Sequence, residues 1–272
     1  MKSHSERTGL VQSIERAFSI IEALKEHQEL GIAELSAQLS LDRSTVHRLL
    51  ATLRVLGYVN QNRENFKYSN SLKFFDIGHS VVRSLGLGRI AMPFMKALAE
   101  ETQVGINLAV MESYSVVYIE KIESQSTIRA TLPLGVYMPA YCTGLGKMLL
   151  SCMDEKEIRD VFRSSDEAAS RSTPHDNIKL RRYTANTITN LDLLCEELAN
   201  IRKRGYSLDD EEYISGLYCI AVPIRDYQGC TVAAMSAVLL KIIGTDIQSK
   251  AQDVLKKLTA AAGSISASLG YH

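Results

Sequence analysis

Residues 40–68 have the sequence SLDRSTVHRLLATLRVLGYVNQNRENFKY, and this stretch decides the fold of the N-terminal part of the chain. Residues 40–42 predict a turn, and a helix is expected after it that ends at Gly57. Two short stretches rich in aromatic and β-branched residues follow, 58–59 and 66–68, and the polar residues between them indicate a β-hairpin. The inward side of the helix is formed by Val46, Leu49, Leu50 and Leu53.

Two more helices are expected before this stretch. Ile14, Phe18 and Ile21 recur at helical spacing, which predicts an amphipathic helix over residues 15–27. Gly31 interrupts the pattern, and a short helix follows whose apolar side is formed by Ile32, Leu35 and Leu39. The order of helix, helix, tight turn, helix and hairpin is that of a winged helix-turn-helix. In that fold the third helix enters the major groove of DNA, and the hairpin, or wing, lies near the DNA backbone.

Charge is unevenly distributed along a chain whose formal net charge is zero. Residues 43–73 contain six basic residues and one acidic residue, whereas residues 1–42 contain four basic and seven acidic residues. A basic stretch of this kind suits a surface that faces phosphates, and a solvated face is the alternative. Hydroxyl side chains at the start of a helix could also serve only to cap it. The candidate DNA contacts are Arg43, Ser44, Thr45, His47, Arg48, Thr52, Arg63 and Lys67.

Residues 1–70 are therefore expected to form a DNA-binding domain, residues 71–102 a helical linker, and residues 103–272 a second domain. Strands and helices that mix as they do in this second domain predict an α+β fold with an antiparallel sheet. Its strand-like stretches are residues 106–111, 116–122, 218–224 and 231–239. Its helical patterns cover residues 145–152, 154–162, 191–204 and 245–269.

The composition favours a cytoplasmic protein that does not contact a membrane. No apolar run approaches the roughly 18 residues of a membrane span, and residues 1–9 are polar. The five cysteines are odd in number and never form a Cys-x-x-Cys pair. That pattern argues against a disulfide framework and against a structural zinc site.

Familiar catalytic motifs are missing from the sequence. It contains no Gly-x-Ser-x-Gly, His-Glu-x-x-His or Gly-x-Gly-x-x-Gly pattern. We therefore expect no enzyme activity, no cofactor and no metal. Three alternatives stay open: an enzyme that acts on a small acid and carries an appended DNA-binding domain, a redox sensor that uses Cys142 or Cys219, and a zinc site formed by Asp209 and Cys219.

Several motifs, in their order and spacing, resemble those of the IclR-type (isocitrate lyase regulator) transcriptional regulators. The resemblance covers nearly the whole chain, and its N-terminal matches are residues 43–53, Leu56-Gly-Tyr-Val and Tyr68. It implies a GAF-like C-terminal domain that senses a small molecule, homodimers or homotetramers, palindromic operators, and effectors that are often small organic acids. The C-terminal matches are Pro139, residues 143–150, Asn186-Thr-Ile-Thr, and residues 204–224 with the sequence RGYSLDDEEYISGLYCIAVPI.

The resemblance also implies an effector pocket. Backbone N–H groups of the Gly-rich turn at 144–146 would suit a carboxylate if the turn opens a helix, and a plain tight turn is the alternative. Two departures distinguish this chain: Tyr141 stands where the family commonly carries His, and Val238 where many members have a second Ser. Glu211 and Glu212 are expected in a solvated loop. The candidate effector contacts are Met138, Tyr141, Gly144, Leu145, Asp209, Leu217, Cys219 and Ser236.

These patterns together indicate a ligand-responsive regulator that represses a catabolic operon. It is expected to bind a palindromic, double-stranded DNA operator and a small carboxylic acid. A single winged helix-turn-helix reads few base pairs, so a homo-oligomer with two-fold symmetry is expected, and residues 72–85 are expected to help join its protomers.

Overall fold

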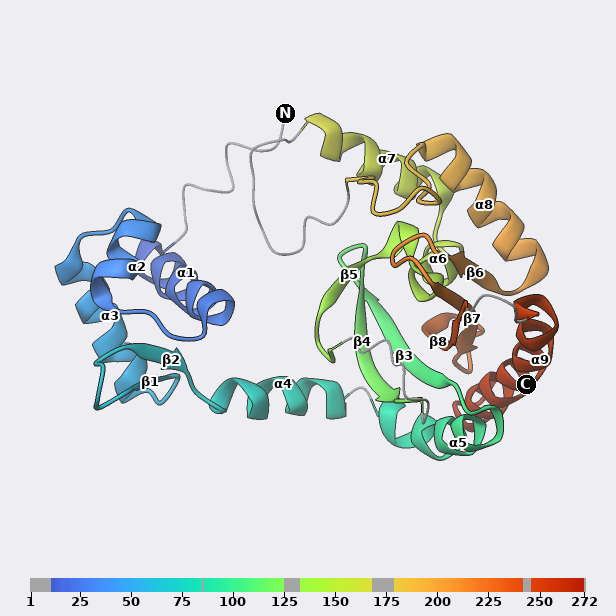
Figure 1. Cartoon of the computed structure of the whole chain (residues 1–272), viewed down its shortest axis with the longest axis horizontal. Coiled ribbons are helices and arrows are strands. Elements are labelled where there is room, and N and C mark those ends of the chain that lie inside the picture. The colour runs from blue at the N-terminus through green and yellow to red at the C-terminus, as the bar shows by residue number, and fades with distance from the viewer. Residues whose placement is uncertain (1–10, 85, 125–132, 168–178, 242–245, 272) are drawn as a thin grey trace. The chain divides into compact units, whose positions relative to one another are not determined.

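The computed structural model describes residues 11–84, 86–124, 133–167, 179–241 and 246–271. The chain divides into two compact units, Met1–Ser84 and Leu85–His272 (Figure 1). The division falls among the residues expected to form a linker, since α4 (Lys73–Ser84) belongs to the first unit and α5 (Leu87–Thr102) to the second. The role of residues 71–102 as a linker stays a prediction.

The N-terminal unit has the predicted order of a winged helix-turn-helix. Helices α1 (Gln12–His27), α2 (Ile32–Leu39) and α3 (Arg43–Val55) are followed by an antiparallel hairpin of β1 (Val59–Gln61) and β2 (Tyr68–Asn70). The core of this unit includes three of the four residues expected on the inward side of α3, and the fourth, Leu49, packs against it half-buried. The buried members are Ile20, Ala23, Leu24, Leu30, Leu35, Val46, Leu50, Leu53, Val59 and Tyr68.

The structure departs from the sequence pattern at two places in this unit, although α1 covers the residues expected to be helical. Ile14 and Phe18 are more than half exposed, and Ile20 takes the inward place on α1. The reason is that α1 carries apolar residues on two faces, and periodicity does not say which face the other helices cover. The second strand begins at Tyr68, because Phe66 has a positive φ of 58° and belongs to the turn.

The C-terminal unit contains a six-stranded antiparallel sheet in the order β5-β4-β3-β8-β7-β6, which confirms the predicted α+β class. Four of its strands end within one residue of their expected bounds. The other two are short and contain Pro or two Asp residues, which strands disfavour, so the sequence did not predict them. The strands are β3 (Gly105–Glu112), β4 (Ser115–Ile122), β5 (Tyr137–Pro139), β6 (Ser207–Asp210), β7 (Leu217–Arg225) and β8 (Thr231–Leu240).

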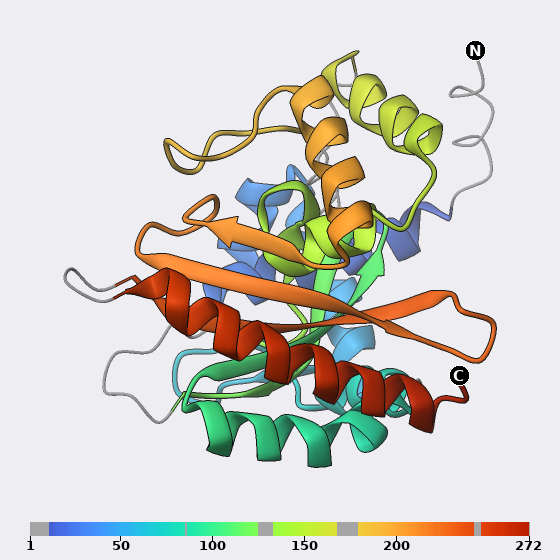
Figure 2. The same ribbon diagram turned by 90° about the vertical axis from the view of Figure 1, so that its right-hand side faces the viewer.

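Helices cover both faces of the sheet. Figure 2 shows α9 (Ile247–Ser268), in red, beside α5, in green; α9 packs on β7 and β8, and α5 on β3 and β4. On the other face, α6 (Gly144–Leu150) packs on the sheet and on α8 (Leu191–Arg204), which α7 (Glu155–Glu167) contacts. Thr245, the expected start of the last helix, lies outside the described residues. Among those residues no helix is both long enough and apolar enough to cross a membrane.

Helix α6 is buried along its whole length and is fixed at its start. Thr143 is its N-cap: the Thr143 hydroxyl accepts a hydrogen bond from the Gly146 N–H at 3.2 Å and donates one to the Pro139 carbonyl at 3.1 Å. A short 3-10 helix, η2 (Ala140–Cys142), lies against α6. A Cβ atom at Gly146 would lie 2.2 Å from the Ala140 carbonyl oxygen, so only glycine fits at this close approach.

Candidate functional site

A cavity lies where the start of α6 meets the sheet. Six of the eight expected effector contacts line it, namely Gly144, Leu145, Asp209, Leu217, Cys219 and Ser236. The remaining lining residues, none of which was among the expected contacts, are Asn107, Tyr118, Thr143, Tyr213, Ile214 and Val238. The free volume, counted for the centre of a water molecule, is about 20 Å³, which holds little more than one water. A larger ligand must therefore displace part of the wall.

The strand register brings the polar groups of the wall together. Asp209 on β6 pairs with Cys219 on β7, which in turn pairs with Val238 on β8. Ser236 on β8 pairs with Asn107 on β3. Directly paired residues share one face of a sheet, so these two rows face α6 as neighbours. Asn107 is a polar residue in an otherwise apolar strand, and this pattern in the sequence could have revealed Asn107 as a cavity residue.

Two expected contacts do not reach the cavity wall. Met138 is buried in β5 and belongs to the surrounding core. Tyr141 is also buried in that core, where its ring packs edge-on against Phe162 with 6.3 Å between ring centroids. The Tyr141 hydroxyl donates a hydrogen bond to the Arg181 carbonyl at 2.7 Å. Its ring and hydroxyl therefore stabilise the core beside the cavity in this structure.

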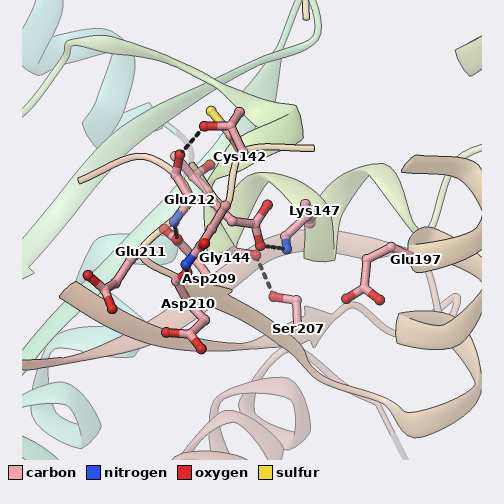
Figure 3. A network of polar contacts seen from close by, with 12 residues as sticks. Cys142, Gly144, Lys147, Glu197, Ser207, Asp209, Asp210, Glu211 and Glu212 are labelled. Atoms are coloured by element: carbon pink, nitrogen blue, oxygen red, sulfur yellow. Dashed lines mark hydrogen bonds and ion pairs between the residues drawn. The ribbon is translucent and has the colours of Figure 1, made fainter. Parts of the chain in front are cut away.

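A buried ion pair lies next to the cavity. Lys147, on α6, donates to the carboxylate of Glu212, and the two side chains are only 1% and 9% exposed (Figure 3). The expectation that Glu212 is solvated is therefore wrong. Glu211, its neighbour, is half-buried and pairs with Lys241 at 2.6 Å. Asp209 joins the group, because it accepts a hydrogen bond from the Glu212 N–H at 2.8 Å.

The two buried carboxyl groups hold protons more tightly than exposed ones do. Burial raises the pKa of Asp209 to about 6, against the lowering effect of the Glu212 N–H bond and the Lys147 charge. Burial likewise raises the pKa of Glu212 to about 7, although Lys147 opposes this. The desolvation of the charged form is the main cause in both cases.

The thiols near the cavity lack the properties of a redox sensor. Burial raises the pKa of Cys142 and of Cys219. A sensor thiol needs a lowered pKa, so the structure argues against that alternative. Asp209 and Cys219 are paired on the sheet, yet within the described ranges no cluster of three or more His, Cys, Asp or Glu residues could hold a metal ion.

The expected DNA contacts on α3 lie together on its outward side. Arg43, His47, Arg48 and Thr52 are exposed there. The side chain of Asp42 is the N-cap of α3, and it accepts hydrogen bonds from the Ser44 and Thr45 hydroxyls at 2.5 and 2.8 Å. Those bonds lower the pKa of Asp42. Ser44 and Thr45 therefore bond to the capping side chain without being the cap themselves, and their contact with DNA stays a prediction.

The wing is tied to α2 and to the turn before it. Lys67 pairs with Glu34 at 3.0 Å, and the Asn65 amide donates to Glu29 at 3.1 Å. Arg63 is exposed at the turn of the hairpin. Of the two basic wing residues expected to contact DNA, only Lys67 has an acidic partner among the described residues. Lys67 would have to leave Glu34 before it could contact a phosphate.

Two family profiles match the chain over most of its length. "Bacterial transcriptional regulator IclR C-terminal" matches residues 79–267, and "IclR helix-turn-helix domain" matches residues 13–63. The chain belongs to the IclR family. As an IclR-family member it is a DNA-binding transcriptional regulator with an effector domain and not an enzyme.

Relatives of known name agree with this IclR assignment. The HTH-type transcriptional regulator KdgR of Escherichia coli (strain K12) is 35% identical over 96% of this chain and 94% of its own length. The DNA-binding transcriptional repressor YiaJ of the same organism is 33% identical over 100% of this chain and 92% of its own length. The crystal structure of an IclR homolog from Microbacterium hydrocarbonoxydans, complexed with 4-hydroxybenzoate, has the same fold, with a TM-score of 0.76 at 22% identity over 94% of this chain and 98% of that chain.

Proposed function

We propose that this IclR-family regulator represses a catabolic operon and that a small carboxylic acid, bound in the cavity beside α6, changes its affinity for the operator. The observation that carries the proposal is the convergence of Asp209, Ser236 and Asn107 on one cavity with apolar walls. A few polar groups in an otherwise apolar cavity are typical of a small-molecule site. The name of the YiaJ relative supports repression as the direction of control.

The chemistry of the wall suits a small oxygen-rich ligand. Ser236 and Asn107 offer hydrogen-bond donors and acceptors from adjacent strands, and Asp209 can accept from a ligand hydroxyl. Leu145 and Leu217 supply apolar contact. Ile214 is exposed and Tyr213 half-buried, so this loop is the part of the wall that a larger acid could displace most easily.

DNA binding is assigned to the outward side of α3 together with the wing. We propose that Arg48 reads a base or holds a phosphate, and that Arg43 and His47 lie along the same groove. A homo-oligomer would present two such surfaces to the two halves of a palindrome. Leu72, just before α4, is 85% exposed, and an exposed apolar side chain there suits a contact between protomers.

Calorimetry with purified protein tests the effector site. A thermal-shift screen of organic, sugar and aromatic acids first finds an acid that stabilises the native state. Asp209→Ala and Ser236→Ala should then each weaken binding of that acid, whereas Gln228→Ala, an exposed change in the β7–β8 turn, should not. Unchanged affinity in both cavity variants, for an acid that alters operator binding by the parent, would place the effector site elsewhere.

A further inference from the structure

The cavity and its immediate surroundings hold more negative than positive charge. Asp209 lines the cavity and is 5% exposed, and Glu212 follows it three residues later. Lys147 is the only cation that contacts this pair among the described residues, and its ammonium faces Glu212. The other Glu212 oxygen, Oε2, is buried and accepts no hydrogen bond from the described residues. Two buried carboxylates thus have one ammonium group near them, and that group is bonded to Glu212 (Figure 3).

Among the described residues, no side chain that lines the cavity supplies the missing positive charge. Within the part of the chain that the structure describes, the lining of the cavity contains no Lys, Arg or His. Two cations nearby are already paired with other carboxylates: Lys241 with Asp210 at 2.6 Å and Arg204 with Glu197 at 2.8 Å. The remaining titratable groups that interact with Asp209 or Glu212 are neutral thiols and a phenol, namely Cys142, Cys219 and Tyr118. The Tyr213 phenol also lines the cavity.

An organic acid that enters as its anion would therefore bring a third negative charge into a site with one cation. Burial of an uncompensated charge is strongly unfavourable, and a group in that position takes up a proton instead. We propose that the cavity binds a monocarboxylic acid together with one proton, held by the Asp209–Glu212 pair, and that it rejects dicarboxylic acids. The proposal rests on the proposed function and adds to it the charge of the effector.

The proton comes from solvent and converts an acceptor into a donor. Protonated Asp209 can donate its O–H to the carboxylate of the bound acid, whereas the ionised group would repel it. The raised pKa values of Asp209 and Glu212 make this uptake inexpensive near neutral pH. Because the two groups interact, the proton belongs to the pair rather than to either residue. A dicarboxylate would need a second proton, and Lys147 would then face a neutral pair.

The sign of the pH dependence follows from this uptake. In the free protein the pair loses its protons as the pH rises through about 6 and about 7. The complex retains one proton, so affinity falls as the pH rises. Above about pH 7 the dissociation constant should increase about tenfold per pH unit, and between about pH 6 and pH 7, where the free pair already holds one proton, it should level off.

The experiment is calorimetry of the full chain with two matched pairs of probes. 4-Hydroxybenzoate and gluconate are the monocarboxylates, and terephthalate and glucarate are dicarboxylates of similar shape. At about pH 7.5, titrations in phosphate and in Tris, which differ in ionisation enthalpy, count the protons taken up. We expect close to one proton for a monocarboxylate that binds, and binding of its matched dicarboxylate at least about tenfold weaker.

Two variants separate this proposal from a merely structural role. Asp209→Asn keeps an oxygen for the Glu212 N–H but cannot ionise, so proton uptake should fall to near zero and the pH dependence should flatten. Glu211→Gln removes a neighbouring acid outside the lining and should leave uptake unchanged. Binding of a monocarboxylate without proton uptake, or equally tight binding of its dicarboxylate partner, would overturn the proposal and leave the proposed function intact. If no monocarboxylate binds at any pH, the proposed function fails, and this inference fails with it.

Discussion

Replacing Gly146 with alanine tests how tightly α6 is held against the segment before it. The new Cβ would lie 2.2 Å from the Ala140 oxygen, 2.3 Å from its Cα and 2.6 Å from its carbonyl carbon. All three atoms are backbone, so no side chain can rotate away. The segment also cannot move freely, because the Pro139 carbonyl accepts a hydrogen bond from Thr143.

The magnitude follows from two opposing effects. An extra methyl group in a packed interior costs about 1–3 kcal/mol, and contacts with backbone belong at the upper end of that range. Alanine gains about 1 kcal/mol over glycine in a helix. We therefore expect Gly146→Ala to lower the free energy of unfolding of the C-terminal unit by about 2 kcal/mol or more. For a domain of this size that corresponds to a loss of about 4–8 °C in melting temperature.

Thermal melts followed by circular dichroism measure the change, and α9 provides the matched control. A Cβ at Gly263 would meet nothing within 4 Å, so Gly263→Ala should leave the melting temperature unchanged or raise it. If Gly146→Ala melts within about 1 °C of the parent, the close packing of α6 on η2 is wrong.

Three further changes should have separable effects. Arg48→Ala should weaken operator binding by about 1–3 kcal/mol in a gel-shift titration without loss of stability. Val46→Asp should instead unfold the N-terminal unit, because Val46 is fully buried. Normal operator binding by Arg48→Ala would show that the DNA-contact side of α3 is misassigned. Lys147→Met should cost about 3–5 kcal/mol of stability in urea unfolding at about pH 8, because Glu212 stays buried and charged. A smaller loss is expected at about pH 5, and equal losses at both pH values would contradict this. The pKa values of Asp209 and Glu212 are raised on folding, so their contribution to stability is present below about pH 4 and is lost as the pH rises through about 7. Asp209→Asn should therefore reduce the dependence of the melting temperature on pH, which melts across the pH range measure.

Local patterns were enough to predict most of the helices and the long strands, but not the two short strands or the side of α1 that the core covers. The α3 helix follows from periodicity, because it buries one side along its length. The four long strands follow from near-continuous apolar runs, because helices cover both faces of the sheet. Ile14 and Phe18 show the limit of that signal, since a helix with two apolar faces does not reveal which one is covered. Short strands such as β5 carry too few residues for any period to be visible.

The cavity was predicted in large part, and its charges were not. Asp209, Cys219 and Ser236 lie in a stretch of recognisable motifs, and the strand register then brings them together. Glu212 stands in a run of acids, which on its own predicts a solvated loop. Its buried partner, Lys147, lies 65 residues earlier in the chain, so only the tertiary fold reveals the pair.

The most direct measurement is the affinity of the full chain for an operator, selected by the protein from random duplexes, with and without an acid found in the thermal-shift screen. Fluorescence anisotropy should show that the acid shifts the operator dissociation constant of the parent and leaves that of Asp209→Ala nearly unchanged. By linkage, the operator must shift the affinity for the acid by the same factor. An equal shift in the parent and in Asp209→Ala, or no shift in the parent with any acid that binds, would contradict regulation through this cavity.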